Sequence, residues 1–66
     1  MTVAELESVA ELRRQGNPTE ALAKLDRGSE SKQDAPYHYE RGRVLEDLGR
    51  YEEAMACYEK AVERQP

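Results

Sequence analysis

The sequence predicts an all-α protein in which four helices form two tandem antiparallel helical hairpins. Of its 66 residues only six are β-branched (four Val, two Thr), whereas Ala, Leu, Glu, Arg, Lys and Gln dominate most segments. Near the C-terminus the apolar residues recur at the i, i+3, i+4, i+7 spacing of one helical face. The two halves of the chain also repeat each other. These observations favour helices and leave no segment that fits a strand.

The first predicted helix begins at Thr2 and runs to Gln15. The Thr2 hydroxyl can accept a hydrogen bond from the helix backbone while the Glu5 side chain reaches back, which is the reciprocal pairing of a capping box. Gly16 follows the helix, and a glycine at this place commonly ends a helix in the left-handed conformation. We therefore expect a sharp turn at Gly16.

The second predicted helix follows this turn and extends to about Arg27. Asn17 supplies a cap residue, Pro18 takes a first-turn position that needs no N–H, and Glu20 adds an acid to the first turn. Residues 28–33 contain no apolar side chain. This stretch is expected to hold the frayed end of the helix and a loop.

The third predicted helix is introduced by Asp34 and Pro36 and ends at Leu48, just before Gly49. The fourth begins at Tyr51 and ends against Pro66. Its expected apolar face comprises Tyr51, Ala54, Met55, Tyr58, Ala61 and Val62.

The repeat relates positions that are 33 residues apart. Leu12 and Gly16 correspond to Leu45 and Gly49, and Ala21, Leu22 and Leu25 correspond to Ala54, Met55 and Tyr58. The chain is therefore divided into two helix–turn–helix repeats, residues 1–33 and 34–66, which together form one small domain.

Composition excludes several classes of function. The net charge is -4, and neither half of the chain is basic, so binding to the phosphate backbone of nucleic acid is disfavoured. The longest apolar run, residues 54–58, is too short to span a membrane, and no signal peptide is recognisable at the N-terminus. With one unpaired Cys these features predict a cytoplasmic protein. One Cys and one His also exclude a disulfide or a metal centre within a single chain.

The second repeat resembles the tetratricopeptide repeat family, whose unit of about 34 residues is a helical hairpin. The residues that match the family pattern are Gly42, Leu45, Gly49, Tyr51, Ala54, Tyr58, Ala61 and Pro66. Small residues at 42, 54 and 61 suit a close approach of two helices, with Leu45, Tyr51 and Tyr58 filling the surroundings. His38 and Arg41 depart from the pattern, and the first repeat departs further, at Glu5, Ser8, Val9 and Gly28.

The resemblance implies an α-solenoid fragment that binds a protein or peptide on its concave wall. By register, that wall would comprise Val3, Leu6, Ala10 and Arg13 in the first repeat, and Tyr39, Arg43 and Glu46 in the second. One subset of the family grips the carboxylate end of chaperone tails with Lys, Arg and Asn on this wall. Leu6, Ala10 and Glu40 stand at three of those places here, so such an acidic tail is not expected as the ligand.

Two other functions compete with peptide binding. An enzyme would have to use His38 or Cys57, but we expect His38 to pack at the repeat interface and Cys57 to act as a small helix residue. No catalytic, cofactor or metal site is therefore predicted. A self-associating repeat is the alternative, because the fourth helix should expose an apolar stripe. Copies would then form a homo-oligomer by stacking end to end or by exchanging a hairpin through residues 28–33.

Overall fold

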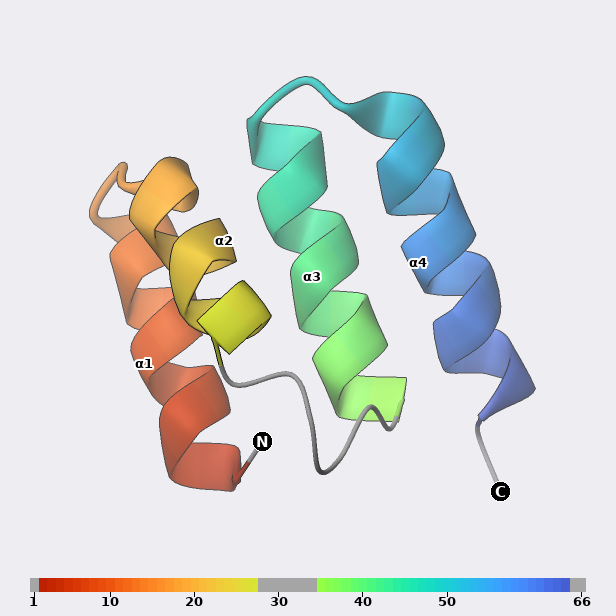
Figure 1. The fold of residues 1–66 in the computed structure, drawn as a ribbon, viewed down its shortest axis with the longest axis horizontal. Helices are drawn as coiled ribbons and strands as arrows, with labels where there is room; N and C mark the ends of the chain where they lie inside the picture. The colour runs from red at the N-terminus through yellow and green to blue at the C-terminus, as the bar shows by residue number, and fades with distance from the viewer. Residues whose placement is uncertain (1, 28–34, 65–66) are drawn as a thin grey trace.

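The computed structural model describes residues 2–27 and 35–64, which form four α-helices. They are α1 (Val3–Arg14), α2 (Pro18–Arg27), α3 (Ala35–Asp47) and α4 (Tyr51–Glu63). Figure 1 shows that α1 and α2 run antiparallel as one hairpin and that α3 and α4 form a second hairpin beside it. The predicted all-α fold is confirmed. The predicted roles of residues 28–33, Asp34 and Pro66 lie outside the described residues.

The helix ends form as the local sequence predicts. Thr2 and Glu5 make the capping box, with the Glu5 N–H donating to the Thr2 hydroxyl at 3.2 Å and the Thr2 N–H donating to the Glu5 carboxylate at 3.0 Å. Gly16 and Gly49 adopt φ values of +83° and +78°, a left-handed conformation that costs a glycine little. The first and third helices end one residue earlier than expected, at Arg14 and Asp47, because residues 15–16 and 48–49 form the turns.

The core lies mainly between the two hairpins. α3 contributes Tyr37 and Val44 to a buried cluster with Val9 of α1 and with Ala21 and Leu25 of α2. A second cluster, Leu45, Ala54 and Cys57, fills the contact between α3 and α4. Leu22 packs against both clusters and joins them. Burying one large aliphatic side chain contributes about 1.5–3 kcal/mol, so these few residues account for much of the stability of a small domain.

Gly42 marks the closest contact within the second hairpin. A Cβ atom on this residue would stand 2.7–3.0 Å from three ring atoms of Tyr58, nearer than real side-chain atoms approach each other. The ring of Tyr58 therefore lies on the bare backbone of α3. This confirms the sequence-based expectation that Gly42 permits a close approach.

The two residues of the second repeat that depart from the family pattern, Arg41 and His38, both make contacts within the protein. Arg41 is paired with Asp26 at the end of α2, with the Arg41 Nη1 atom 2.6 Å from the Asp26 Oδ1 atom. His38 is buried, with 4% of its surface exposed, and its ring meets that of Tyr37 edge to face at 5.2 Å. The expectation that His38 packs inside is confirmed.

The predicted apolar face of α4 is only half buried. Ala54 and Ala61 are buried as expected, but Tyr51, Met55 and Val62 are 64%, 63% and 67% exposed. The buried side of α4 instead includes Cys57. Tyr51 was expected to fill the hairpin and does not, because it lies on the flank of α4 that no helix of the described chain covers.

Candidate functional site

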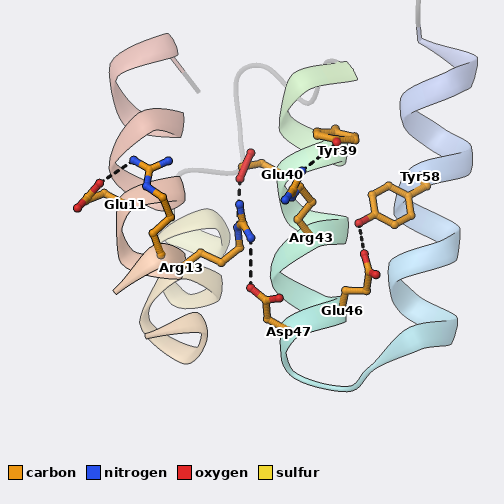
Figure 2. Close-up of polar contacts among 9 residues, drawn as sticks. Glu11, Arg13, Tyr39, Glu40, Arg43, Glu46, Asp47 and Tyr58 are labelled. Carbon is orange, nitrogen blue, oxygen red and sulfur yellow. Dashed lines mark hydrogen bonds and ion pairs between the residues drawn. The ribbon is translucent and has the colours of Figure 1, made fainter. Parts of the chain in front are cut away.

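One hollow gathers side chains from three helices. It is lined by Arg13 of α1, by Tyr39, Arg43, Glu46 and Asp47 of α3, and by Tyr58 of α4. Figure 2 shows these six side chains on one side of the molecule, with α3 in the middle. Four of them, Arg13, Tyr39, Arg43 and Glu46, are residues that the sequence placed on the concave wall.

The other three predicted residues lie next to this hollow. Val3, Leu6 and Ala10 line a second depression between α1 and α3, together with Glu7, Pro36, Tyr39 and Glu40. Tyr39 belongs to both depressions, so all seven predicted residues share one continuous surface. We call this surface, formed by the two depressions, the inner face.

An aromatic pair beside a guanidinium occupies the centre of the inner face. Arg43 donates a hydrogen bond to the Tyr39 hydroxyl at 3.1 Å, and its guanidinium carbon lies 5.7 Å from the centre of the Tyr39 ring. The rings of Tyr39 and Tyr58 are 5.7 Å apart and tilted by 51°. Tyr39 is nevertheless 48% exposed. The group is held in place by its own contacts while keeping an open aromatic surface.

Tyr58 is fixed from the other side by Glu46. Its hydroxyl donates a short hydrogen bond to the Glu46 carboxylate, which comes from the facing helix α3. Burial and, after it, this hydrogen bond to a negative group raise the pKa of Tyr58 to about 12. Tyr58 is therefore a neutral hydrogen-bond donor at physiological pH.

Arg13 ties the two hairpins together at the edge of the inner face. Its Nε atom lies 3.6 Å from Glu40 and its Nη1 atom 3.5 Å from Asp47. The side chains of Arg13 and Glu40 are only 17% and 16% exposed. The charge of Arg13 is thus balanced by carboxylates within the protein, whereas Arg43 donates its hydrogen bond to the hydroxyl of a tyrosine, Tyr39.

Sequence reasoning did not place four residues of this surface on the wall: Glu7, Pro36, Asp47 and Tyr58. Asp47 could have been found from the repeat, because stacked hairpins bring a residue close to positions about one repeat later, and Asp47 is 34 residues after Arg13. Tyr58 was assigned to the hairpin interior. Its ring does pack there, but a tyrosine is long enough for its hydroxyl to emerge on the inner face.

The two candidates for catalytic chemistry are placed unfavourably for it. His38 and Cys57 are 4% and 8% exposed. Burial raises the pKa of the Cys57 thiol, although the nearby charge of Arg41 opposes this, so the reactive thiolate is disfavoured. Among residues 2–27 and 35–64, no three His, Cys, Asp or Glu side chains are grouped to hold a metal ion. None of the four helices is long and apolar enough to cross a membrane.

The fold and the inner face together define a helical-repeat protein built from stacked antiparallel hairpins. Residues 35–66 match the family model described as Tetratricopeptide repeat. The second hairpin therefore belongs to the tetratricopeptide repeat family, and the four helices of the described residues fit tandem repeats of that kind. No curated protein and no solved structure gave a significant match. Repeats of this family are generally non-enzymatic modules for protein–protein interaction, and they bind proteins or peptides.

Proposed function

We propose that the inner face binds a peptide segment of another protein and that the chain has no catalysis of its own. The observation that carries this proposal is the group formed by Tyr39, Arg43 and Tyr58. Tyrosine and arginine are enriched among the residues that dominate binding energy at interfaces. Here they are already ordered by mutual contacts, so a ligand would lose little side-chain freedom from the protein on binding.

The charges around this group indicate the kind of peptide. Arg43 offers guanidinium N–H groups beside an open ring, so a backbone carbonyl or carboxylate next to an apolar side chain suits it. Glu40 and Asp47 are engaged by Arg13, and Glu46 by Tyr58. A strongly acidic ligand would meet these carboxylates. We therefore expect a peptide that is mainly apolar, with few acidic residues.

The test is selection of ligands from a displayed library of short linear peptides, followed by measurement of each Kd. Replacing Tyr39 and Arg43 together by Ala should weaken the selected peptides by about tenfold or more, because truncating an interface hot spot typically costs at least 1–2 kcal/mol. The helical circular dichroism spectrum should not change, since both side chains are at least partly exposed.

A matched control removes one tyrosine and one arginine elsewhere. Tyr51 is exposed on α4, and Arg14 is exposed on α1, where it pairs with Glu11. Neither lines the two depressions. The Tyr51→Ala and Arg14→Ala double variant should bind the selected peptides as the parent does. Equal affinities for all three proteins would remove the inner face as the binding site.

A further inference from the structure

The second hairpin carries an apolar surface outside the centre of the inner face. Met55 and Val62 of α4 are 63% and 67% exposed, and with Tyr58, Glu59 and Glu63 they line a shallow groove. We call this groove the α4 groove. No helix of the described chain lies on it. It shares only Tyr58 with the hollow around Arg43.

The first hairpin shows what kind of element fits such a groove. Met55 and Tyr58 correspond through the 33-residue repeat to Leu22 and Leu25. In the first hairpin these two positions are covered: Leu25 is fully buried and Leu22 packs against both core clusters. The covering element is α3, which places Tyr37 and Val44 there. A helix is therefore the natural occupant of the α4 groove.

The charges beside the groove specify that helix further. Asp26 pairs with Arg41 of the covering helix at 2.6 Å, and the residue that corresponds to Asp26 in the second hairpin is Glu59. A basic residue is thus favoured at the place that Arg41 takes on α3. Glu59 has the same negative charge as Asp26 and can therefore pair with such a basic residue.

On the other side of the helix contact, the charge in the second hairpin is opposite to the charge in the first. Arg13 faces two acids of the covering helix, Glu40 and Asp47, but the residue that corresponds to Arg13 in the second hairpin is Glu46. A helix seated on the second hairpin would bring its own residues at these two places close to a carboxylate. Both of those residues should then be basic rather than acidic.

We propose that the partner of the α4 groove is a basic amphipathic helix. Counting from the position equivalent to Tyr37, that helix carries apolar residues at i and i+7 and Lys or Arg at i+3, i+4 and i+10, the places of Glu40, Arg41 and Asp47 on α3. At 100° per residue the apolar positions form the centre of one face, with basic residues on both sides. The groove has an apolar centre with Glu59 and Glu63 along one side, and Glu46 lies beyond the other side, in the hollow that shares Tyr58 with the groove.

A second copy stacked end to end fits this groove poorly. Its α1 would have to take the place of α3, and the residues that correspond to Tyr37, Glu40, Arg41 and Val44 are Ala4, Glu7, Ser8 and Glu11. Glu7 would face Glu46, and Glu11 would enter the apolar position. Of the three basic places the same chain fills only that of Asp47, with Arg14, and it lacks the apolar residue at the place of Val44.

The probe for this proposal is a synthetic peptide with the sequence of α3, residues 35–47, carrying Glu40→Lys and Asp47→Lys. A peptide of this length is marginally helical alone, so a staple joins peptide positions 42 and 46, on the side opposite Tyr37 and Val44. Fluorescence anisotropy of the labelled probe measures its Kd for the full chain. The probe with the unaltered Glu40 and Asp47 should bind roughly tenfold more weakly, because two attractive pairs become repulsive.

Charge exchange then identifies the contact with Glu59. Glu59→Lys in the protein should weaken the Lys-bearing probe several-fold, and a probe that also carries Arg41→Glu should recover that loss. Glu20→Lys is the matched control, because it makes the same change of charge at an exposed residue in the first turn of α2. It should leave the Kd of every probe unchanged.

Loss of the apolar centre separates this site from the inner face. Met55→Ser with Val62→Ser should abolish binding of the helical probe, while peptides selected on the inner face should still bind. Both side chains are mostly exposed, so this variant keeps its fold. Equal binding of the Lys-bearing and unaltered probes, or no recovery on charge exchange, would refute the proposal. Sedimentation showing self-association that this variant abolishes would assign the groove to a second copy instead.

Discussion

The two hairpins solve the same packing problem with different pairs of residues. In the second hairpin, Gly42 on α3 gives room to the ring of Tyr58 on α4. The corresponding positions in the first hairpin are Val9 and Leu25, which are both fully buried in one cluster. The space between the two helices is filled by a glycine and a tyrosine in the second hairpin and by a valine and a leucine in the first. Only the arrangement of glycine and tyrosine allows a side chain to cross the contact and reach the inner face.

The hairpins also differ in what covers them. The second helix of the first hairpin is covered by α3, and its Leu25 is completely buried. The second helix of the second hairpin keeps Met55 and Val62 in solvent. Nearly the same local pattern therefore yields core in one repeat and an exposed apolar surface in the other. The following substitutions test this comparison.

The largest effect is expected from Leu25→Ala. This side chain is fully buried, and its removal should lower the free energy of unfolding by about 2–5 kcal/mol through lost burial and the cavity that remains. Met55→Ala, on the uncovered helix, should change it by less than about 0.5 kcal/mol. Urea denaturation followed by circular dichroism gives both values. Similar losses in the two variants would contradict the assigned coverage.

The next effect concerns the glycine–tyrosine contact. Gly42→Leu should cost about 1–3 kcal/mol, because the added side chain collides with the Tyr58 ring. Gly42→Val together with Tyr58→Leu copies the pair of the first hairpin and should recover most of the loss seen for Gly42→Val alone. Thermal melts of the three variants make the comparison. A double variant no more stable than Gly42→Val alone would show that the two hairpins do not pack equivalently.

A smaller effect is expected from the ion pair between the hairpins. Arg41→Met keeps most of the side-chain volume but removes the pair with Asp26. Because the two side chains are 28% and 57% exposed, the loss should be about 0.2–1 kcal/mol and should shrink in high salt. Arg50→Met is the control, because it breaks the pair with Glu53 inside the second hairpin only. The salt dependence of both melting temperatures provides the measurement.

The smallest effect is a change of stability at high pH. Burial and the hydrogen bond to Glu46 raise the pKa of Tyr58 from 10 to about 12 in the folded state. The unfolded chain thus releases this proton first, so the contribution is complete below pH 10 and disappears as the pH rises from 10 to 12. Solvent screening of this partly exposed group limits the loss to less than about 1 kcal/mol.

Tyr58→Phe is the reference for this pH effect. In this variant the free energy of unfolding should fall less between pH 10 and 12 than in the parent protein. In Tyr51→Phe it should fall as in the parent, because Tyr51 is an exposed residue of the same helix. Tyrosinate absorbance of the parent protein should contain a late step, near pH 12, that Tyr58→Phe removes. Absence of this step from the difference between the two titration curves would exclude the Tyr58–Glu46 contact.

Local sequence determined the helices and their ends. The Thr2–Glu5 capping box depends on residues three positions apart, and Gly16 and Gly49 take φ values that other residues rarely adopt. The 33-residue spacing also revealed the repeat, and small Gly42 indicated a close helix contact. Each of these features is written in neighbours along the chain or in the comparison of its two halves. The seven wall residues were implied instead by the family resemblance, and in the structure they line two adjoining depressions.

Tertiary structure decided which apolar residues are covered and which charges meet. Periodicity puts Ala54, Met55 and Val62 on one broad stripe, but Ala54 is buried only because α3 lies against it, and the other two stay exposed because no described helix does. Arg41 and Arg13 find Asp26 and Asp47 across the hairpin interface, at separations of 15 and 34 residues. Burial and long-range ion pairs depend on the placement of neighbouring helices, which no single helix records in its own sequence.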